Sequence, residues 1–335
     1  MDDSPGFVLA FDLGGTHLRA ALIDEDGAIH SGVKHQTPVT TTANEVVNAL
    51  VAAARESESR LPPGQLIRAV SVAVPGSVNA ASGVVVQAPN LSSLDGFQLA
   101  TALTSELGLA ATVENDANAA AVGEMWRGAA RGFRTIVCLT LGTGVGGGII
   151  LDGKLWRGVN NSAGEIGHTC VDPFSDVACT CGSRGCLERF ASATGIVRMT
   201  RETQSRFPNS VWQSGDQFTS ADVYQAGVQG DALALEVMQR VGFYLGVALA
   251  NLVNLLNPEM IVIGGGVANG WNLFAEEMKK QVAERAFPVP AAQVKLVRAE
   301  CGDDAGLLGA ARLGFDSIAE TESKSRGRLS SSLLG

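Results

Sequence analysis

Short apolar runs, glycine turns and amphipathic segments follow one another along the chain. Residues 7–27, FVLAFDLGGTHLRAALIDEDG, have the pattern of a strand, a glycine turn, a second strand and an Asp-Gly turn. Residues 42–58 place apolar side chains at helical spacing, and residues 66–76, LIRAVSVAVPG, have the composition of a short buried strand. The first part of the chain therefore predicts a mixture of strands and helices.

The alternation of strands and helices continues through the rest of the chain. Residues 83–91 predict a strand, residues 97–108 a helix, and residues 111–128 a strand that passes into an alanine-rich helix. A long apolar helix is expected at about 235–256, and EMIVIGGGVANG, residues 259–270, predicts a buried strand, a glycine turn and the start of a helix.

The C-terminal part of the chain changes in character. The last periodic segment is DDAGLLGAARLGF, residues 303–315. Beyond Ile318 the sequence is polar and rich in serine, which is typical of segments without a packed core. We therefore expect a disordered tail at 321–335.

The opening hairpin pattern recurs in the middle of the chain. Residues 134–156, RTIVCLTLGTGVGGGIILDGKLW, repeat the order of strand, glycine turn, strand and Asp-Gly turn. Leu13-Gly14 corresponds to Leu141-Gly142, and Asp26-Gly27 corresponds loosely to Asp152-Gly153. The repeat predicts an α/β fold of two similar domains with a ligand cleft between them. We expect a smaller domain at 1–118 plus 305–320 and a larger one at 119–304.

Both glycine turns are candidate phosphate-binding loops. Glycine permits a positive φ and lets backbone N–H groups approach a ligand without a Cβ in the way. A tight hairpin turn is the alternative for either loop alone, but two turns after similar strands favour phosphate. Asp12 ends an apolar run, where a carboxylate is costly unless a cation meets it, and Mg²⁺ carried by a nucleotide is such a cation.

The familiar nucleotide fingerprints do not account for these loops. Gly142, Gly144 and Gly147 match G-x-G-x-x-G, but the following segment GGIILDGKL is strand-like, whereas the dinucleotide fingerprint requires a helix there. The sequence also lacks a Walker A motif. Paired hairpins are therefore the expected phosphate-binding elements.

Asn115 and Asp116 stand before the alanine-rich helix and have two interpretations. They are good helix-capping residues. Alternatively, Asp116 accepts a proton from an attacking hydroxyl, because a loose phosphoryl-transfer transition state asks little of a base except its position. Asn115 offers a donor and an acceptor that suit a sugar hydroxyl.

Three cysteines crowd into ACTCGSRGCLE, residues 178–188. Cys179, Cys181 and Cys186, with His168 in the upstream GEIGH, make a Cys₃His set that is typical of a closed structural zinc site. A redox pair or simple packing are weaker interpretations, since C-x-C is not the C-x-x-C of a thioredoxin-like site. Cys170 is a rival ligand, and the two remaining cysteines, Cys138 and Cys301, are expected in the core.

Composition and charge narrow the class of protein. The 335 residues are 46% hydrophobic and 18% charged, with a net charge of −9. An acidic chain lacks the basic face of a general nucleic-acid-binding protein. Its N-terminus does not read as a secretory signal, and no uninterrupted apolar run approaches the roughly 20 residues of a membrane span. We expect a cytoplasmic protein without disulfides that binds small molecules, with no nucleic-acid or membrane partner.

Six motifs in order make the chain resemble a known family. DLGGT, NDANAAAVGE, LGTGVGGG, GEIGH, CTCGSRGCLE and IVIGGGVA resemble those of the ROK family of sugar kinases and sugar-responsive repressors, over about residues 7–315. The resemblance implies two actin-like (ribonuclease H-like) domains, ATP with Mg²⁺, a structural Zn²⁺, and phosphorylation of a hexose at its 6-hydroxyl. It also implies a homodimer or a homotetramer.

The resemblance assigns roles to individual positions. Asp116 resembles the catalytic base. The positions that resemble sugar contacts are Gly76, Asn90, Asn115, Asp116, Glu165, His168 and Glu188. Those that resemble nucleotide contacts, including Asp12, are Gly14, Gly15, Thr16, Thr143, Gly144, Gly264, Gly265 and Gly266. A zinc loop would then hold Glu165, His168 and Glu188 around one sugar, whereas ordinary surface charge is the alternative for the two glutamates.

Two classes of function follow from this resemblance. The first is an ATP-dependent hexose kinase, with glucose as the expected substrate and N-acetylglucosamine or N-acetylmannosamine as alternatives. The second is a sugar-sensing regulator, which in this family carries a helix-turn-helix ahead of the first hairpin. Here that hairpin begins by Phe7, so we expect the kinase.

Overall fold

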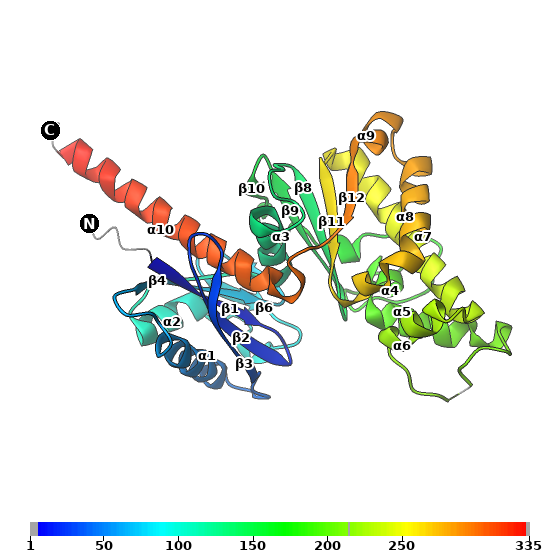
Figure 1. Ribbon diagram of the computed structural model, residues 1–335, viewed down its shortest axis with the longest axis horizontal. Coiled ribbons are helices and arrows are strands. Elements are labelled where there is room, and N and C mark those ends of the chain that lie inside the picture. The colour runs from blue at the N-terminus through cyan, green and yellow to red at the C-terminus, as the bar shows by residue number, and fades with distance from the viewer. Residues whose placement is uncertain (1–5, 214, 333–335) are drawn as a thin grey trace. The chain divides into compact units, whose positions relative to one another are not determined.

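The computed structural model describes residues 6–213 and 215–332, with side chains described up to residue 325 (Figure 1). Two compact units make up the chain. The first comprises residues 1–131, 157–163 and 303–335, and the second comprises residues 132–156 and 164–302. The chain thus passes from one unit to the other several times, and the short segment 157–163 belongs to the first unit although the residues on both sides belong to the second.

A five-stranded mixed sheet forms the centre of the first unit, in the order β3-β2-β1-β4-β7. Its strands are β1 Gly6–Leu13, β2 His17–Ile23, β3 Ile29–Gln36, β4 Leu66–Val74 and β7 Ala111–Asn115. The first three strands are antiparallel neighbours, and β4 and β7 run parallel to β1. A separate two-stranded sheet pairs β5 Ser77–Asn79 with β6 Val84–Gln87.

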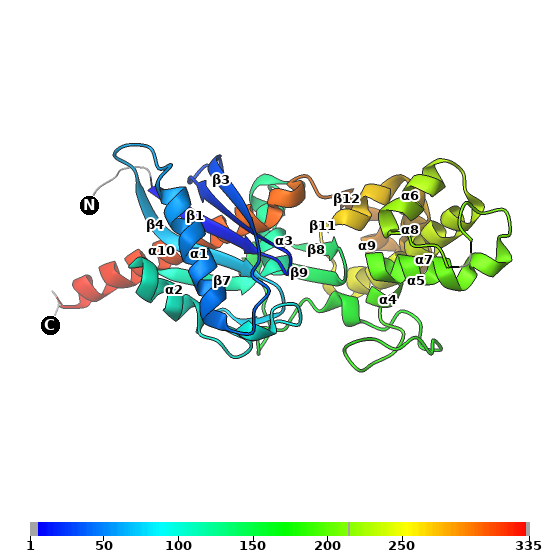
Figure 2. The same ribbon diagram turned by 90° about the horizontal axis from the view of Figure 1, so that it is seen from below.

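Alternation along β1 gives this sheet two buried faces. Leu9 and Phe11 belong to the core cluster that also contains the buried residues of helices α1 (Ala43–Glu58) and α2 (Leu99–Leu107). Val8, on the opposite face, packs beside Gly314 of helix α10. Figures 1 and 2 accordingly show α1 and α2 on one face of the sheet and α10 on the other.

Helix α10 (Ala305–Ser332) lies closely against α3 (Asp116–Arg127) because both contain glycine at the crossing. A Cβ on Gly309 would stand 1.6 Å from the carbonyl oxygen of Ala119, which no side chain tolerates. The prediction of a disordered tail at 321–335 is wrong up to Ser332, and residues 333–335 lie outside the described part. The helix continues from its buried first turns, and Glu322 pairs with Arg68 on β4 at 2.6 Å.

The second unit repeats the strand topology of the first. Its sheet has the order β10-β9-β8-β11-β12, in which β8, β9 and β10 are antiparallel neighbours and β11 and β12 run parallel to β8. The strands are β8 Ile136–Leu141, β9 Val145–Leu151, β10 Lys154–Leu155, β11 Met260–Gly264 and β12 Lys295–Arg298. The predicted α/β class and the predicted repeat of the hairpin are therefore confirmed.

Helices cover the second sheet and surround α7 (Ala232–Leu256). The others are α4 Glu188–Ala191, α5 Ala193–Thr203, α6 Ser220–Val228, α8 Trp271–Arg285 and α9 Pro288–Gln293. Within the described residues, α7 is the one helix long and apolar enough to cross a membrane. Thirteen of its residues are buried, and a Cβ on Gly242 would stand 2.4 Å from the Phe274 carbonyl of α8. Helix α7 is therefore the core helix of this unit.

Candidate functional site

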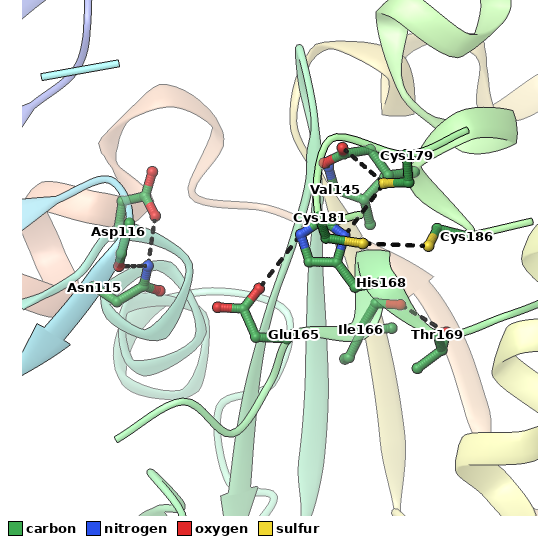
Figure 3. Close-up of polar contacts among 12 residues, drawn as sticks. Asn115, Asp116, Val145, Glu165, Ile166, His168, Thr169, Cys179, Cys181 and Cys186 are labelled. Atoms are coloured by element: carbon green, nitrogen blue, oxygen red, sulfur yellow. Dashed lines mark hydrogen bonds and ion pairs between the residues drawn. The ribbon is translucent and has the colours of Figure 1, made fainter. Parts of the chain in front are cut away.

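Asn115 and Asp116 lie where β7 ends and α3 begins (Figure 3). Asn115 Oδ1 accepts a hydrogen bond from the Asn118 N–H at 3.0 Å, and its amide donates to the Gly76 carbonyl at 2.9 Å and to Asp116 Oδ1 at 3.1 Å. Asp116 Oδ1 also accepts from the Ala117 N–H at 2.8 Å. The helix-cap interpretation of Asn115 is thus confirmed. The same side chain orients the carboxylate that is predicted to be the base.

Sequence reasoning missed the ion pair behind this junction, in which Glu114 is buried and Arg157 is partly exposed. Glu114 accepts hydrogen bonds from the Asn115 N–H and the Asn118 amide, both at 2.9 Å, and its other oxygen lies 2.6 Å from Nε of Arg157. The partners are 43 positions apart in sequence. The only local signal was a glutamate at the end of an apolar strand, where burial of its charge requires a partner.

The first hairpin turn joins β1 to β2 and carries three of the predicted nucleotide contacts, Gly14, Gly15 and Thr16. The Gly14 N–H donates to the His17 carbonyl at 2.8 Å, and Thr37 Oγ1 donates to the Gly14 carbonyl at 2.7 Å. Neither glycine has a positive φ. A Cβ on Gly15 would stand 3.1 Å from Cβ of Asn90, so close approach, rather than the expected left-handed backbone, explains this glycine.

Asp12 lies one residue before the end of β1 and faces the beginning of α10. A Cβ on Gly306 would stand 3.2 Å from its carboxyl carbon. Burial raises the pKa of Asp12, whereas the charge of Arg19 acts in the opposite direction. Arg19 itself donates to the Asp303 carbonyl and to the Asp304 carboxylate. The predicted partner of Mg²⁺ is therefore a carboxylate whose ionised form is disfavoured until a further cation arrives.

The second hairpin turn joins β8 to β9 and is held by residues that follow it in sequence. The Ala193 N–H donates to the Gly142 carbonyl at 2.8 Å. The Val145 N–H donates to Glu188 Oε2 at 3.1 Å, and a Cβ on Gly144 would stand 2.5 Å from the same oxygen. The turn therefore contacts Glu188, a predicted sugar-binding residue. Residue 144 must be glycine for this contact, because any side chain there would clash with the Glu188 carboxylate.

Four predicted metal ligands come together in the second unit (Figure 3). One ligand atom from each of His168, Cys179, Cys181 and Cys186 lies within 4.8 Å of the others. The Cys181 and Cys186 sulfurs are 3.7 Å apart, and the Cys179 sulfur is 3.6 Å from His168 Nδ1. Tetrahedral zinc with bonds of about 2.3 Å to sulfur and 2.0 Å to nitrogen sets such pairs about 3.8 and 3.5 Å apart. These residues fit a zinc ion.

The surroundings of the thiols also suit a cation. Burial raises the pKa of Cys186 to about 12. A backbone hydrogen bond from Ser183 lowers the pKa of Cys181. One thiol therefore resists ionisation while its neighbour favours it, and a metal ion would supply the positive charge that stabilises both thiolates. Cys170 is exposed and lies outside the four-residue cluster. Cys138 is buried on β8, as expected, but the expectation of a core position for Cys301 is wrong, because that residue is partly exposed in the loop before α10.

The cluster and the predicted sugar residues share one stretch of chain. Nδ1 of His168 faces Cys179, and its Nε2 lies 3.9 Å from Glu165 Oε2. Glu188 follows Cys186 by two positions, and its Oε1 is 4.0 Å from the Cys179 sulfur. One ring nitrogen of His168 thus lies toward the thiols and the other toward Glu165. This orientation is the one needed if His168 binds a metal ion with Nδ1 and a sugar hydroxyl with Nε2.

A pocket of about 430 Å³ opens beside the glycine turn after β11. It is lined by Gly266, Val267 and Asn269 of that turn and by residues of α5, α6 and α7, among them Tyr224 and Gln225. Of the three predicted glycines, only Gly266 lines it. Gly265 has φ +83°, and a Cβ there would stand 2.5 Å from the Leu141 carbonyl, so this glycine shapes the turn itself.

Comparison with known proteins agrees with the motifs. The ROK family model matches residues 8–316. The glucokinase of Halalkalibacterium halodurans is 36% identical over 319 residues, which cover 91% of this chain and 94% of that enzyme. A solved ROK family glucokinase from Streptomyces griseus, in complex with glucose and AMPPNP, is 33% identical with a TM-score of 0.79, and the match covers 93% of this chain and 100% of that one. A xylose repressor of Caldicellulosiruptor bescii is 29% identical over 310 residues, which cover 91% of this chain and 77% of the repressor. With a family model matching nearly its whole length, the chain belongs to the ROK family.

Proposed function

We propose that this protein is an ATP-dependent hexose kinase that transfers the γ-phosphoryl group of ATP to the 6-hydroxyl of glucose. One observation carries the proposal. In each unit, a hairpin glycine with a predicted phosphate role lies against a residue with a predicted sugar role: Gly15 against Asn90, and Gly144 against Glu188. A phosphoryl transferase needs such neighbours, because the donor phosphate and the accepting hydroxyl must be within reach of each other.

Asp116 is the base in this proposal. It accepts the proton of the 6-hydroxyl while that oxygen attacks the γ-phosphorus, and the bond from this phosphorus to the bridging oxygen of ADP breaks. Asn115 contributes the remaining lone pair of Oδ1 to the sugar, since its donors are already bound to Gly76 and Asp116. Further sugar contacts come from Gly76, Asn90, Glu165, His168 and Glu188.

ATP and Mg²⁺ are the proposed donor and cofactor. The pocket beside Gly266 is large enough for an adenine ring and offers polar groups from Asn269, Gln225 and Tyr224 for its edge. The two hairpin turns contribute the phosphate contacts at Gly14, Gly15, Thr16, Thr143 and Gly144. Mg²⁺ carried by ATP would supply positive charge against the phosphates, and Asp12 is the carboxylate of this chain that would help to hold it.

Zinc is the proposed structural metal at His168, Cys179, Cys181 and Cys186. The ion supplies a fixed cross-link and no reactive ligand, because four protein ligands leave no open position. The residues of this chain then do the binding: His168 Nε2 and the nearby carboxylates of Glu165 and Glu188 are held ready for sugar hydroxyls.

A sugar panel tests the substrate. Turnover with ATP and Mg²⁺ is measured for glucose, mannose, fructose, N-acetylglucosamine and N-acetylmannosamine, and glucose is expected to have the highest kcat/KM. If an N-acetylated sugar leads by more than about tenfold, or about 1.4 kcal/mol in transition-state binding, the glucose assignment is wrong and the kinase assignment stands. Tight sugar binding without phosphorylation of any sugar would instead indicate a sensor.

Asp116→Asn tests the base. Asparagine keeps an acceptor for the Ala117 N–H and the shape of the side chain, but it does not take up a proton as a carboxylate does. We expect kcat to fall by about 10²–10⁴, while the sugar dissociation constant measured by calorimetry stays within about threefold. Turnover close to that of the wild type would exclude Asp116 as the base.

We also propose that the enzyme is cytoplasmic and assembles as a homodimer or a homotetramer, without nucleic-acid partners. The free thiols of the zinc cluster support a reducing compartment. Sedimentation equilibrium of the purified protein distinguishes the two assemblies from a monomer.

A further inference from the structure

The charge of Glu114 is buried directly behind the predicted base. This residue immediately precedes Asn115 and Asp116, and its side chain is 4% exposed. Its Oε1 accepts hydrogen bonds from the Asn115 N–H and the Asn118 amide, and its Oε2 is bound by Nε of Arg157. A buried carboxylate needs such donors, so all of these groups are held in one arrangement.

Asn118 contributes to this arrangement although burial of its side chain opposes folding. The residue is 2% exposed on the first turn of α3, and its Oδ1 is buried without a hydrogen-bond partner. An unpaired buried amide oxygen opposes folding. The bond from its Nδ2 to Glu114 is the interaction that accounts for an asparagine at this position.

A chain of contacts connects Arg157 to the base. Arg157 binds Glu114, Glu114 holds the main chain of Asn115, and the Asn115 amide donates to Asp116 Oδ1 at 3.1 Å. Arg157 is also the first residue of the segment 157–163, which belongs to the first unit. Two residues after that segment stands Glu165, a predicted sugar contact.

Loss of the guanidinium would leave the buried carboxylate of Glu114 without a charged partner, and the Asn115 N–H and the Asn118 amide would be its remaining described donors. A buried carboxylate without a counter-charge is drawn toward solvent, and this movement would weaken its bonds to Asn115 and Asn118. Asn115 would lose its fixed orientation, and Asp116 Oδ1 would lose the donor on the Asn115 side while it keeps the Ala117 N–H.

We propose that Arg157 is a positioning residue for phosphoryl transfer, acting through Glu114 and Asn115 on the orientation of Asp116. The proposal rests on the proposed kinase function, in which Asp116 is the base. Arg157 itself contacts neither sugar nor nucleotide in this scheme, so its removal affects the chemical step and not the binding of substrates.

Four variants test the role by steady-state kinetics. Arg157→Met should lower kcat about tenfold or more while KM for sugar and for ATP stays within about twofold. Arg157→Lys keeps the charge without the Nε–H donor and should recover part of the rate. In the double variant Glu114→Gln/Arg157→Met, glutamine still accepts from Asn115 and Asn118 without a charge to balance, and kcat should return to within about threefold of the wild type. Arg134→Met, which breaks an exposed ion pair to Asp152, is the matched control and should leave kcat unchanged.

The outcomes separate this role from a structural one and from the proposed function. All rates are measured well below the melting temperature of each variant, so a residue that only stabilises the fold would leave kcat unchanged, and that result overturns the proposal. A double variant as slow as Arg157→Met overturns it as well. If the wild-type protein phosphorylates no sugar, the proposed function fails; if the wild type is active and Arg157→Met equals it, only the positioning role fails.

Discussion

Replacement of Cys181 by serine should lower zinc content and sugar affinity together. Cys181 is exposed, so its loss leaves no core cavity, whereas its sulfur lies 3.7 Å from that of Cys186 within the proposed tetrahedron. A serine hydroxyl is a poor replacement for a thiolate ligand of zinc. Without the ion, the peptide that carries His168 and Glu188 loses its cross-link, and these two side chains lose their fixed positions.

The magnitude follows from the contacts at risk. His168 and Glu188 are each proposed to make a hydrogen bond to the sugar; a bond from the neutral imidazole of a zinc-bound histidine contributes about 0.5–1.5 kcal/mol and one to a carboxylate about 1.5–3 kcal/mol. Loss of both corresponds to about 2–4.5 kcal/mol, or a factor of about 30–2000 in the dissociation constant for glucose. Affinity for the nucleotide should change much less, since the pocket beside Gly266 is formed by other segments.

The assay compares Cys181→Ser with Cys170→Ser. Zinc is counted by mass spectrometry on purified protein, and glucose binding is measured by calorimetry. Cys170 is exposed, belongs to the same loop and lies outside the four-residue cluster, so its variant should keep about one zinc per chain and the affinity of the wild type. Unchanged sugar affinity in zinc-free Cys181→Ser would refute the coupling, and loss of zinc from Cys170→Ser would refute the ligand set.

Two further predictions concern the hairpin turns. Asp12→Asn should raise the melting temperature of the ligand-free protein at pH 7 and lower kcat. Burial raises the pKa of this carboxyl, so its contribution to stability is present below the unfolded pKa and is lost as the pH rises through the folded pKa. Each kcal/mol gained corresponds to about 2–4 °C in a calorimetric scan, and a lower melting temperature would contradict the reasoning. Gly144→Ala should raise KM for the sugar by about tenfold, because the new Cβ would displace Glu188, whereas Gly142→Ala, which has open space around its Cβ position, should behave as the wild type. Equal KM values for the two variants would count against the contact.

Local sequence signals predicted most of the fold. Apolar periodicity predicted β1, β2, β4, α1, α2 and the passage from β7 into α3 in the first unit, and β8, β9, β11 and α7 in the second. The two hairpins follow from Leu-Gly and Asp-Gly pairs at corresponding positions. The Cys₃His cluster was also readable from the sequence, since its cysteines lie within eight residues and Gly182 and Gly185, which separate them, have the positive φ that tight turns require. Each of these features depends on residues close together in sequence.

The missed features depend on contacts between distant residues. Arg157 with Glu114, and Glu188 with Val145, join positions 43 apart, and no periodicity marks such pairs. The helix beyond residue 320 was missed for the same reason. Its composition is polar, and its Glu322 pairs with Arg68 of β4, which is distant in sequence. Polar pairing over long separations is decided by tertiary packing, which composition does not encode.

The two hairpin turns have the same topology but differ in electrostatics. At the first turn, Gly15 lies against the neutral side chain of Asn90, and no carboxylate binds an N–H of the turn among the described contacts. At the second turn, Glu188 already accepts the Val145 N–H. A phosphate that approaches the second turn therefore meets a negative charge at its occupied donor, whereas at the first turn the Gly14 N–H is bound to a neutral carbonyl. Duplicated folds thus do not imply equivalent ligand contacts: if both turns bind phosphate as proposed, we expect the first turn to contribute more to phosphate affinity, because the second turn also holds Glu188 beside the Cys₃His cluster.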